Sequence, residues 1–80
     1  MMARKELVVK LAELFETNPE HLTEEAGPNQ ITGWDSVAAL GVISLMDDAG
    51  AGEITTEDAA AFTTIGAILS FAKARGILSD

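Results

Sequence analysis

The chain of 80 residues contains no cysteine, no tyrosine, one histidine and only two prolines. Without cysteine it can form neither disulfides nor thiolate-ligated metal sites, so one modest hydrophobic core must hold its fold. No stretch approaches the roughly 20 apolar residues that span a bilayer, and the beginning lacks the apolar run of a signal peptide. These absences predict a single domain, located in the cytoplasm, that does not insert into membranes.

Basic side chains are also absent from the middle of the chain. No Lys or Arg lies between Lys10 and Lys73, whereas eleven acidic residues do, and the net charge is −8. Such a field repels nucleic-acid phosphates and anionic lipids, and it attracts basic protein patches. We therefore expect protein partners with basic patches, no nucleic-acid binding, and a monomer, because like charges oppose self-association.

The spacing of apolar residues predicts an all-α fold, a small antiparallel bundle of three long helices and one short helix. Apolar residues that recur at three- and four-residue spacing form one face of a helix, and they do so in the three long segments. The short helix is expected because Thr55 to Asp58 form a cap with acidic residues in the first turn. The expected helices are about residues 3–16, 36–49, 56–62 and 64–75. Residues 17–34 form a long connection that contains both prolines, and we interpret it as an ordered loop.

Asp35 and Ser36 stand at the beginning of the second expected helix. Asp35 is a favourable N-cap, so Ser36 falls in the first turn, exposed and close to unpaired backbone N–H groups and the positive end of the helix dipole. A phosphodiester attached there is stabilised by these groups. The simplest alternative is that the two residues only begin a helix. Hydrolysis by Ser36 is disfavoured, because His21 is the only histidine and no sequence pattern links it to Ser36.

The order of these features resembles the acyl carrier protein family over nearly the whole chain. The shared features are an N-terminal amphipathic helix, a long loop, Asp35-Ser36 at the head of the second helix, Ile54 before a short acidic helix, and Thr64-Ile65-Gly66 opening the fourth. The resemblance implies a carrier domain over residues 1–80, not an enzyme. It also implies that a phosphopantetheinyl transferase attaches 4′-phosphopantetheine from coenzyme A to Ser36. Acyl-loading and acyl-accepting enzymes are then its partners, and acyl groups are held on the arm as thioesters.

The sequence Gly33-Trp34-Asp35-Ser36 resembles that of stand-alone carriers of specialised pathways. The resemblance therefore implies a role in fatty-acid-like, polyketide or cell-surface polysaccharide biosynthesis. Two departures from the family pattern affect partner choice. Val37 replaces the usual leucine or methionine, and Gly41 with Ser44 leaves the second helix short of the acids that dock basic patches. We expect typical fatty-acid synthase enzymes to bind this chain weakly.

Two further sets of side chains complete the expected site. Those expected in the motif and in partner recognition are Trp34, Asp35, Val37, Asp47, Asp48, Glu57 and Asp58. Those expected to line an apolar cleft for the acyl chain are Leu40, Ile43, Met46, Ile54, Phe62, Ile65 and Ile68. Core packing is the alternative for the second set, and packing over the loop is the alternative for Trp34. No metal site is expected, because no pair of histidines is spaced for zinc.

The main alternative function is an unmodified acidic helical module that binds a basic partner with the same anionic surface. Only a carrier gains a phosphopantetheinyl group when it is incubated with coenzyme A and a transferase. Intact mass therefore distinguishes the two functions.

Overall fold

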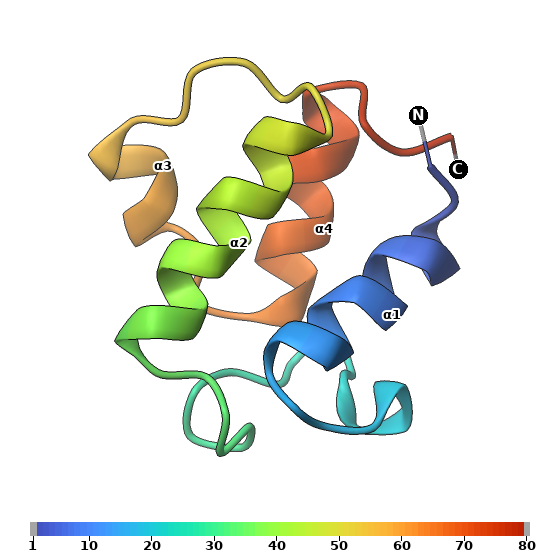
Figure 1. The fold of residues 1–80 in the computed structure, drawn as a ribbon, viewed down its shortest axis with the longest axis vertical. Coiled ribbons are helices and arrows are strands. Elements are labelled where there is room, and N and C mark those ends of the chain that lie inside the picture. Colours follow the sequence, from blue (N-terminus) through green and yellow to red (C-terminus); the bar gives the residue numbers. More distant parts are fainter. Residues whose placement is uncertain (1, 80) are drawn as a thin grey trace.

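The computed structural model describes residues 2–79, and within them the chain forms four α-helices, one 3₁₀ helix and no β-strand (Figure 1). The elements in chain order are α1 (Arg4–Leu14), η1 (Pro19–His21), α2 (Ser36–Asp48), α3 (Thr56–Ala60) and α4 (Ile65–Ala74). The prediction of an all-α fold with three longer helices and one short helix is confirmed.

The long helices do not all alternate in direction. In Figure 1, α2 and α4 both run upward, whereas α1 slopes down across the view. The expected antiparallel arrangement is therefore limited to α1 against the other two long helices. The two ends of the described chain lie together, because the Met2 amide donates to the Ile77 carbonyl (2.8 Å) and the Ser79 amide donates to the Met2 carbonyl (2.9 Å).

Side-chain caps explain where three of the helices begin. The carboxylate of Asp35 caps α2, and the hydroxyl of Thr64 caps α4 by accepting from the Ala67 amide (3.1 Å). A capping box of Thr55 and Asp58 begins α3. Such caps satisfy backbone N–H groups that have no partner within the helix.

The first and third helices end two residues before their expected ends. The chain leaves α1 through Glu16, which has a positive φ of 53°, and the Thr17 amide donates to the Ala12 carbonyl (2.9 Å). This left-handed residue closes the helix as a glycine often does, although glutamate has no special preference for that conformation. The apolar pattern continues beyond Leu14 to Phe15, which explains why periodicity alone extends the helix too far.

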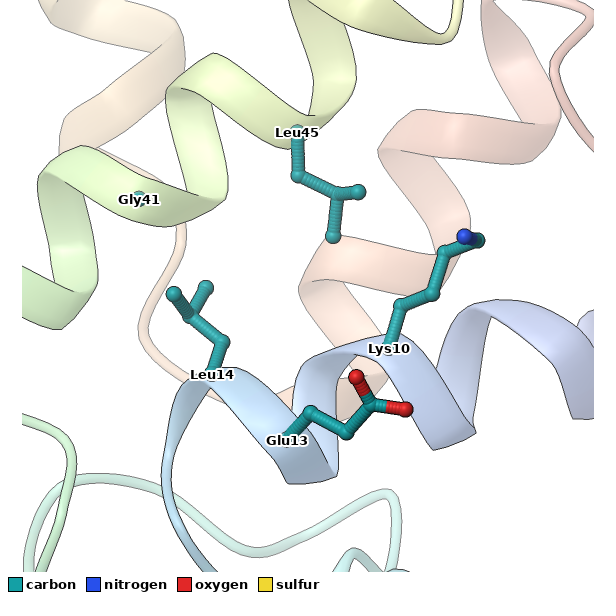
Figure 2. A pocket seen from close by; sticks show the side chains of 5 residues that line it. All are labelled: Lys10, Glu13, Leu14, Gly41 and Leu45. Atoms are coloured by element: carbon teal, nitrogen blue, oxygen red, sulfur yellow. The ribbon is translucent and has the colours of Figure 1, made fainter.

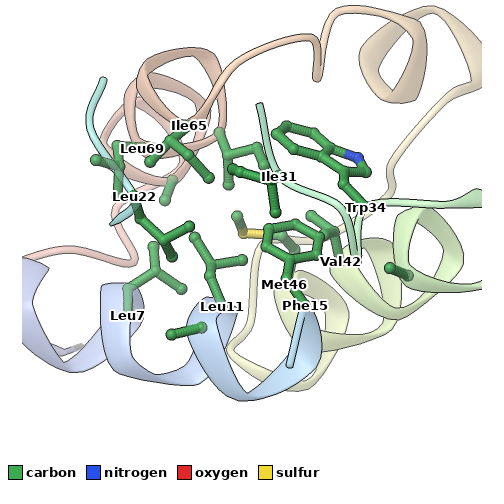
Figure 3. Packing of buried hydrophobic residues seen from close by; sticks show 14 of the residues in the cluster. Leu7, Leu11, Phe15, Leu22, Ile31, Trp34, Val42, Met46, Ile65 and Leu69 are labelled. Carbon is green, nitrogen blue, oxygen red and sulfur yellow. The ribbon is translucent and has the colours of Figure 1, made fainter. Parts of the chain in front are cut away.

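One hydrophobic core joins α1, α2 and α4 to the long loop, as Figure 3 shows. No polar or charged residue is buried within residues 2–79. The loop contributes Leu22, Ile31 and Trp34, so it is an ordered part of the core and not a flexible connection. The largest fully buried side chains are Phe15, Leu7, Leu11, Met46, Ile65, Ile68 and Val42.

Close backbone contacts hold the long loop against α1 and α4. Near α4, the amides of Ile65 and Gly66 donate to the carbonyls of Ala26 and Glu24, both at 2.9 Å. Near α1, the position where a Cβ would stand on Gly33 coincides with the backbone carbonyl of Phe15. Only a glycine fits this approach, because a carbonyl oxygen cannot move aside as a flexible side chain can.

We expect Gly33→Ala to lower the free energy of unfolding by about 1–3 kcal/mol, the usual cost of forcing an extra methyl group into a packed contact. Urea denaturation followed by circular dichroism measures this change. Thr32→Ala is the matched control, since Thr32 is exposed, and it should change stability by less than about 0.5 kcal/mol. Equal stability of the Gly33 variant and the control would contradict the close packing of the loop on α1.

Candidate functional site

Ser36 is the first residue of α2 and is exposed to solvent. Its N-terminal neighbour, Asp35, is the N-cap, and its Oδ1 accepts a hydrogen bond from the Ala38 amide (2.9 Å). This bond spans Ser36 and sets the backbone conformation on both sides of it. The Ser36 hydroxyl makes no hydrogen bond to any residue within 2–79, so the oxygen is presented to solvent without a competing partner.

Trp34 anchors the chain just before this serine. Its side chain is buried, its ring stacks on Phe15 with centroids 4.8 Å apart and planes 18° apart, and its amide donates to the Ile31 carbonyl (3.1 Å). Packing over the loop, the alternative for this residue, therefore describes its position. The indole does not form a surface for a partner or an arm, and its contribution is to hold the start of α2 in place.

Two apolar side chains stand exposed beside Ser36. Val37 is 77% exposed and Leu40 is 67% exposed, and they are three residues apart on one face of α2. Val9, at 38%, is the other exposed large hydrophobic residue within the described chain. Neighbouring large apolar side chains that are left in water are typical of a contact surface for another protein.

A groove of about 310 Å³ lies beside this pair, between α2 and the connection to α3. Three residues expected to line an acyl cleft do line it: Leu40 at its exposed edge, and half-buried Ile43 and Ile54. The other lining residues are Ser44, Asp47, Gly52 and Glu53. The groove is thus apolar along one part and polar along the other.

The remaining residues expected in the cleft lie elsewhere. Met46, Ile65 and Ile68 have no exposed surface and belong to the core, and Phe62 packs edge-on against Phe71, with centroids 5.0 Å apart. None of these four lines the groove. Their helical spacing identified them as apolar positions, but spacing does not tell an inward side chain from one at the edge of a groove.

The acidic residues expected to meet partners divide into free and engaged carboxylates. Asp48 and Glu57 are exposed, and Asp47 borders the groove. Asp58 is half-buried instead, because its Oδ2 accepts from the Thr55 amide (3.0 Å) and from Nη2 of Arg75 (3.0 Å). Its contribution is to the structure of α3, and it is not free for a partner.

These contacts lower the pKa of Asp58 below its ordinary value. The hydrogen bond from the Thr55 amide is the largest cause, and the Thr55 hydroxyl and the Arg75 guanidinium act in the same direction against partial burial. All three favour the charged carboxylate. The carboxylate should therefore stabilise the folded protein at neutral pH.

A second groove, which the sequence did not indicate, lies between α1 and α2 (Figure 2). It has a volume of about 390 Å³, and its lining residues are Lys10, Glu13, Leu14, Gly41 and Leu45. A Cβ on Gly41 would stand 2.5 Å from Cδ1 of Leu14, so the glycine lets the Leu14 side chain lie close against α2. A glycine inside a helix pattern was the one available signal for this contact.

Comparisons of this chain with protein-family models, curated proteins and solved structures gave no match. No helix within residues 2–79 is long and apolar enough to cross a membrane. In the same part of the chain, no group of three or more His, Cys, Asp or Glu side chains is arranged to hold a metal ion. The exposed serine and its surroundings are therefore the features on which a functional proposal can be based.

We expect Asp58→Asn to lower the melting temperature at pH 7 but much less at low pH. A carboxylate with a depressed pKa stabilises the fold above its unfolded pKa of about 3.9, and this stability is lost as the pH falls through the lower folded value. The difference in melting temperature between the wild type and Asp58→Asn should thus be constant above about pH 5 and should fall towards zero below the unfolded pKa. Asp47→Asn, which removes an exposed carboxylate, is the control. A difference for Asp58→Asn that does not depend on pH would contradict stabilisation of the fold by the charged carboxylate.

Proposed function

We propose that this protein is an acyl carrier, with a 4′-phosphopantetheine arm attached to the oxygen of Ser36. The observation that carries the proposal is the exposed Ser36 hydroxyl, which has no partner among the described residues, at the capped N-terminus of α2. The likeness of the whole helical order to acyl carrier proteins supports it. So does the exposed apolar pair next to the serine.

The local chemistry suits an attached phosphodiester. The amides of Ser36 and Val37 donate to no residue within 2–79, since the Asp35 cap takes the amide of Ala38. Free amides and the positive end of the helix dipole favour an anion at this position by about 0.3–1 kcal/mol. Asp35 is the one negative charge next to the attachment point, and its cap bond directs the carboxylate at the backbone of α2.

Each part of the chain has a separate role in this proposal. Within the transferase, the Ser36 oxygen attacks the pantetheine-side phosphorus of the coenzyme A pyrophosphate and gives its proton to a base of the transferase. The new phosphodiester bond replaces the bond to the bridging oxygen of the pyrophosphate, and adenosine 3′,5′-bisphosphate leaves. When attached, the arm supplies a terminal thiol that holds the acyl group as a thioester. Leu40, Ile43 and Ile54 line the groove that takes the first part of an apolar acyl chain. The protein performs no reaction by itself.

The partners would be a phosphopantetheinyl transferase and the enzymes that load and accept the acyl group. The acidic surface attracts basic patches on such enzymes, and exposed Val37 and Leu40 offer an apolar contact at the point of docking. A cytoplasmic role in fatty-acid-like, polyketide or cell-surface polysaccharide biosynthesis fits this set of partners.

Incubation with coenzyme A and a promiscuous phosphopantetheinyl transferase should add one phosphopantetheinyl group, measured as intact mass. Ser36→Ala should gain nothing, because the oxygen that forms the phosphodiester is absent. Ser44→Ala is the matched control, since Ser44 is an exposed serine on the same helix, and it should be loaded fully. An unmodified product with several transferases would favour the acidic interaction module instead.

Val37→Ala should reduce kcat/KM for this loading reaction by about tenfold, since about two methylene equivalents of contact with the transferase are lost. The stability of the variant should be nearly unchanged, because the side chain is 77% exposed. Val9→Ala removes the same atoms from an exposed position on α1 and should be loaded at the normal rate. Equal loading rates for Val37→Ala and Val9→Ala would show that Val37 does not contact the transferase.

A further inference from the structure

The connection between α2 and α3, residues 49–55, forms one wall of the groove, and we call it the strap. Two of its glycines adopt positive φ, Gly50 at 93° and Gly52 at 82°. Gly52, Glu53 and Ile54 line the groove, yet no amide of residues 52–54 donates a hydrogen bond to another described residue. The strap is thus joined to α2 at its beginning and to α3 at its end, with little backbone bonding between.

One side chain from another part of the chain holds this strap. Nη1 of Arg75, the residue after α4, donates to the carbonyls of Ala51 and Glu53, both at 2.8 Å. Nη2 donates to Asp58 at the start of α3 (3.0 Å). The guanidinium carbon also lies 4.5 Å from the centre of the Phe71 ring. A planar guanidinium makes all these contacts at once, which an ammonium group cannot do.

We propose that Arg75 is a positioning residue that holds the strap against α2 and thereby sets the length of acyl chain that the groove admits. This inference rests on the proposed function for its acyl cargo, but the contacts of Arg75 stand without it. Ile54, which lines the groove together with Leu40 and Ile43 of α2, lies on the strap between Glu53 and α3. When the guanidinium is removed, two carbonyls lose their partner, and the glycine conformations at positions 50 and 52 give the strap freedom to move Ile54 away from α2.

Amide hydrogen exchange of the unmodified protein tests the first half of the proposal. In Arg75→Gln, the amides of Ala51 and Thr55 should exchange about tenfold faster, since hydrogen bonds to a charged group are lost. Arg75→Lys should give a smaller increase in rate. Lys73→Gln is the matched control, because it removes the same charge two residues earlier in the chain. The exposed Lys73 side chain makes no hydrogen bond or ion pair with the strap.

The pattern of exchange separates positioning from general destabilisation. If the amides of α1 accelerate in Arg75→Gln as much as those of the strap, the variant has lost global stability and the proposal is overturned. Should Arg75→Gln fail to fold, the same comparison in Arg75→Lys decides the question. Unchanged exchange at Ala51 and Thr55 in a folded variant also overturns the proposal.

The second half is tested by loading the chain from acyl coenzyme A substrates of increasing length, from acetyl to dodecanoyl, and measuring the melting temperature of each product. In the wild type, the gain in melting temperature should stop increasing at the length that fills the groove. In Arg75→Gln this limit should shift to longer chains, whereas Lys73→Gln should keep the wild-type limit. The same limit in all three proteins would overturn the assignment of chain-length control to Arg75. If Ser36 accepts no arm, the proposed function and this second half fail, while the exchange measurement still decides whether Arg75 holds the strap.

Discussion

The contact between the long loop and the end of α1 determines where the exposed serine at the start of α2, Ser36, stands. Trp34 stacks on Phe15, and Gly33 lies directly against the Phe15 carbonyl, so the two residues before the cap of α2 are fixed to another helix. Asp35 and Ser36 are then exposed to solvent while the backbone before them is held in place. A small domain with few aromatic residues thus uses two of its largest side chains to position a short polar segment.

The surface around Ser36 combines a general attraction with a local contact. The net charge of −8 acts over the whole molecule and affects the rate of encounter with a basic partner. Between Ser36 and Met46, however, α2 carries no charged residue, and its exposed large side chains near the serine are Val37 and Leu40. In the proposed carrier, charge would therefore bring a partner to the molecule, and apolar contact would determine how closely it docks at the serine.

Local sequence signals predicted local structure well. The spacing of apolar residues led to the three long helices, the cap and acidic first turn at residues 55–58 led to the short one, and the cap at Asp35 led to a helix start at Ser36, where the structure has it. The groove was predicted only in part, because periodicity marks Met46, Ile65 and Ile68 as apolar but does not show that the core encloses them. The strap could not be predicted, since Arg75 reaches carbonyls 22 and 24 residues away, and no local pattern records such a contact.

The pairing of Met2 with Ile77 and Ser79 brings the beginning and the end of the described chain to one corner. In Figure 1 this corner lies at the upper right, whereas α2 begins at the lower left. A polypeptide fused to either end therefore departs from the side remote from the serine, and a short linker between the ends would allow circular permutation. Fusion at either end would therefore leave the N-terminus of α2 accessible.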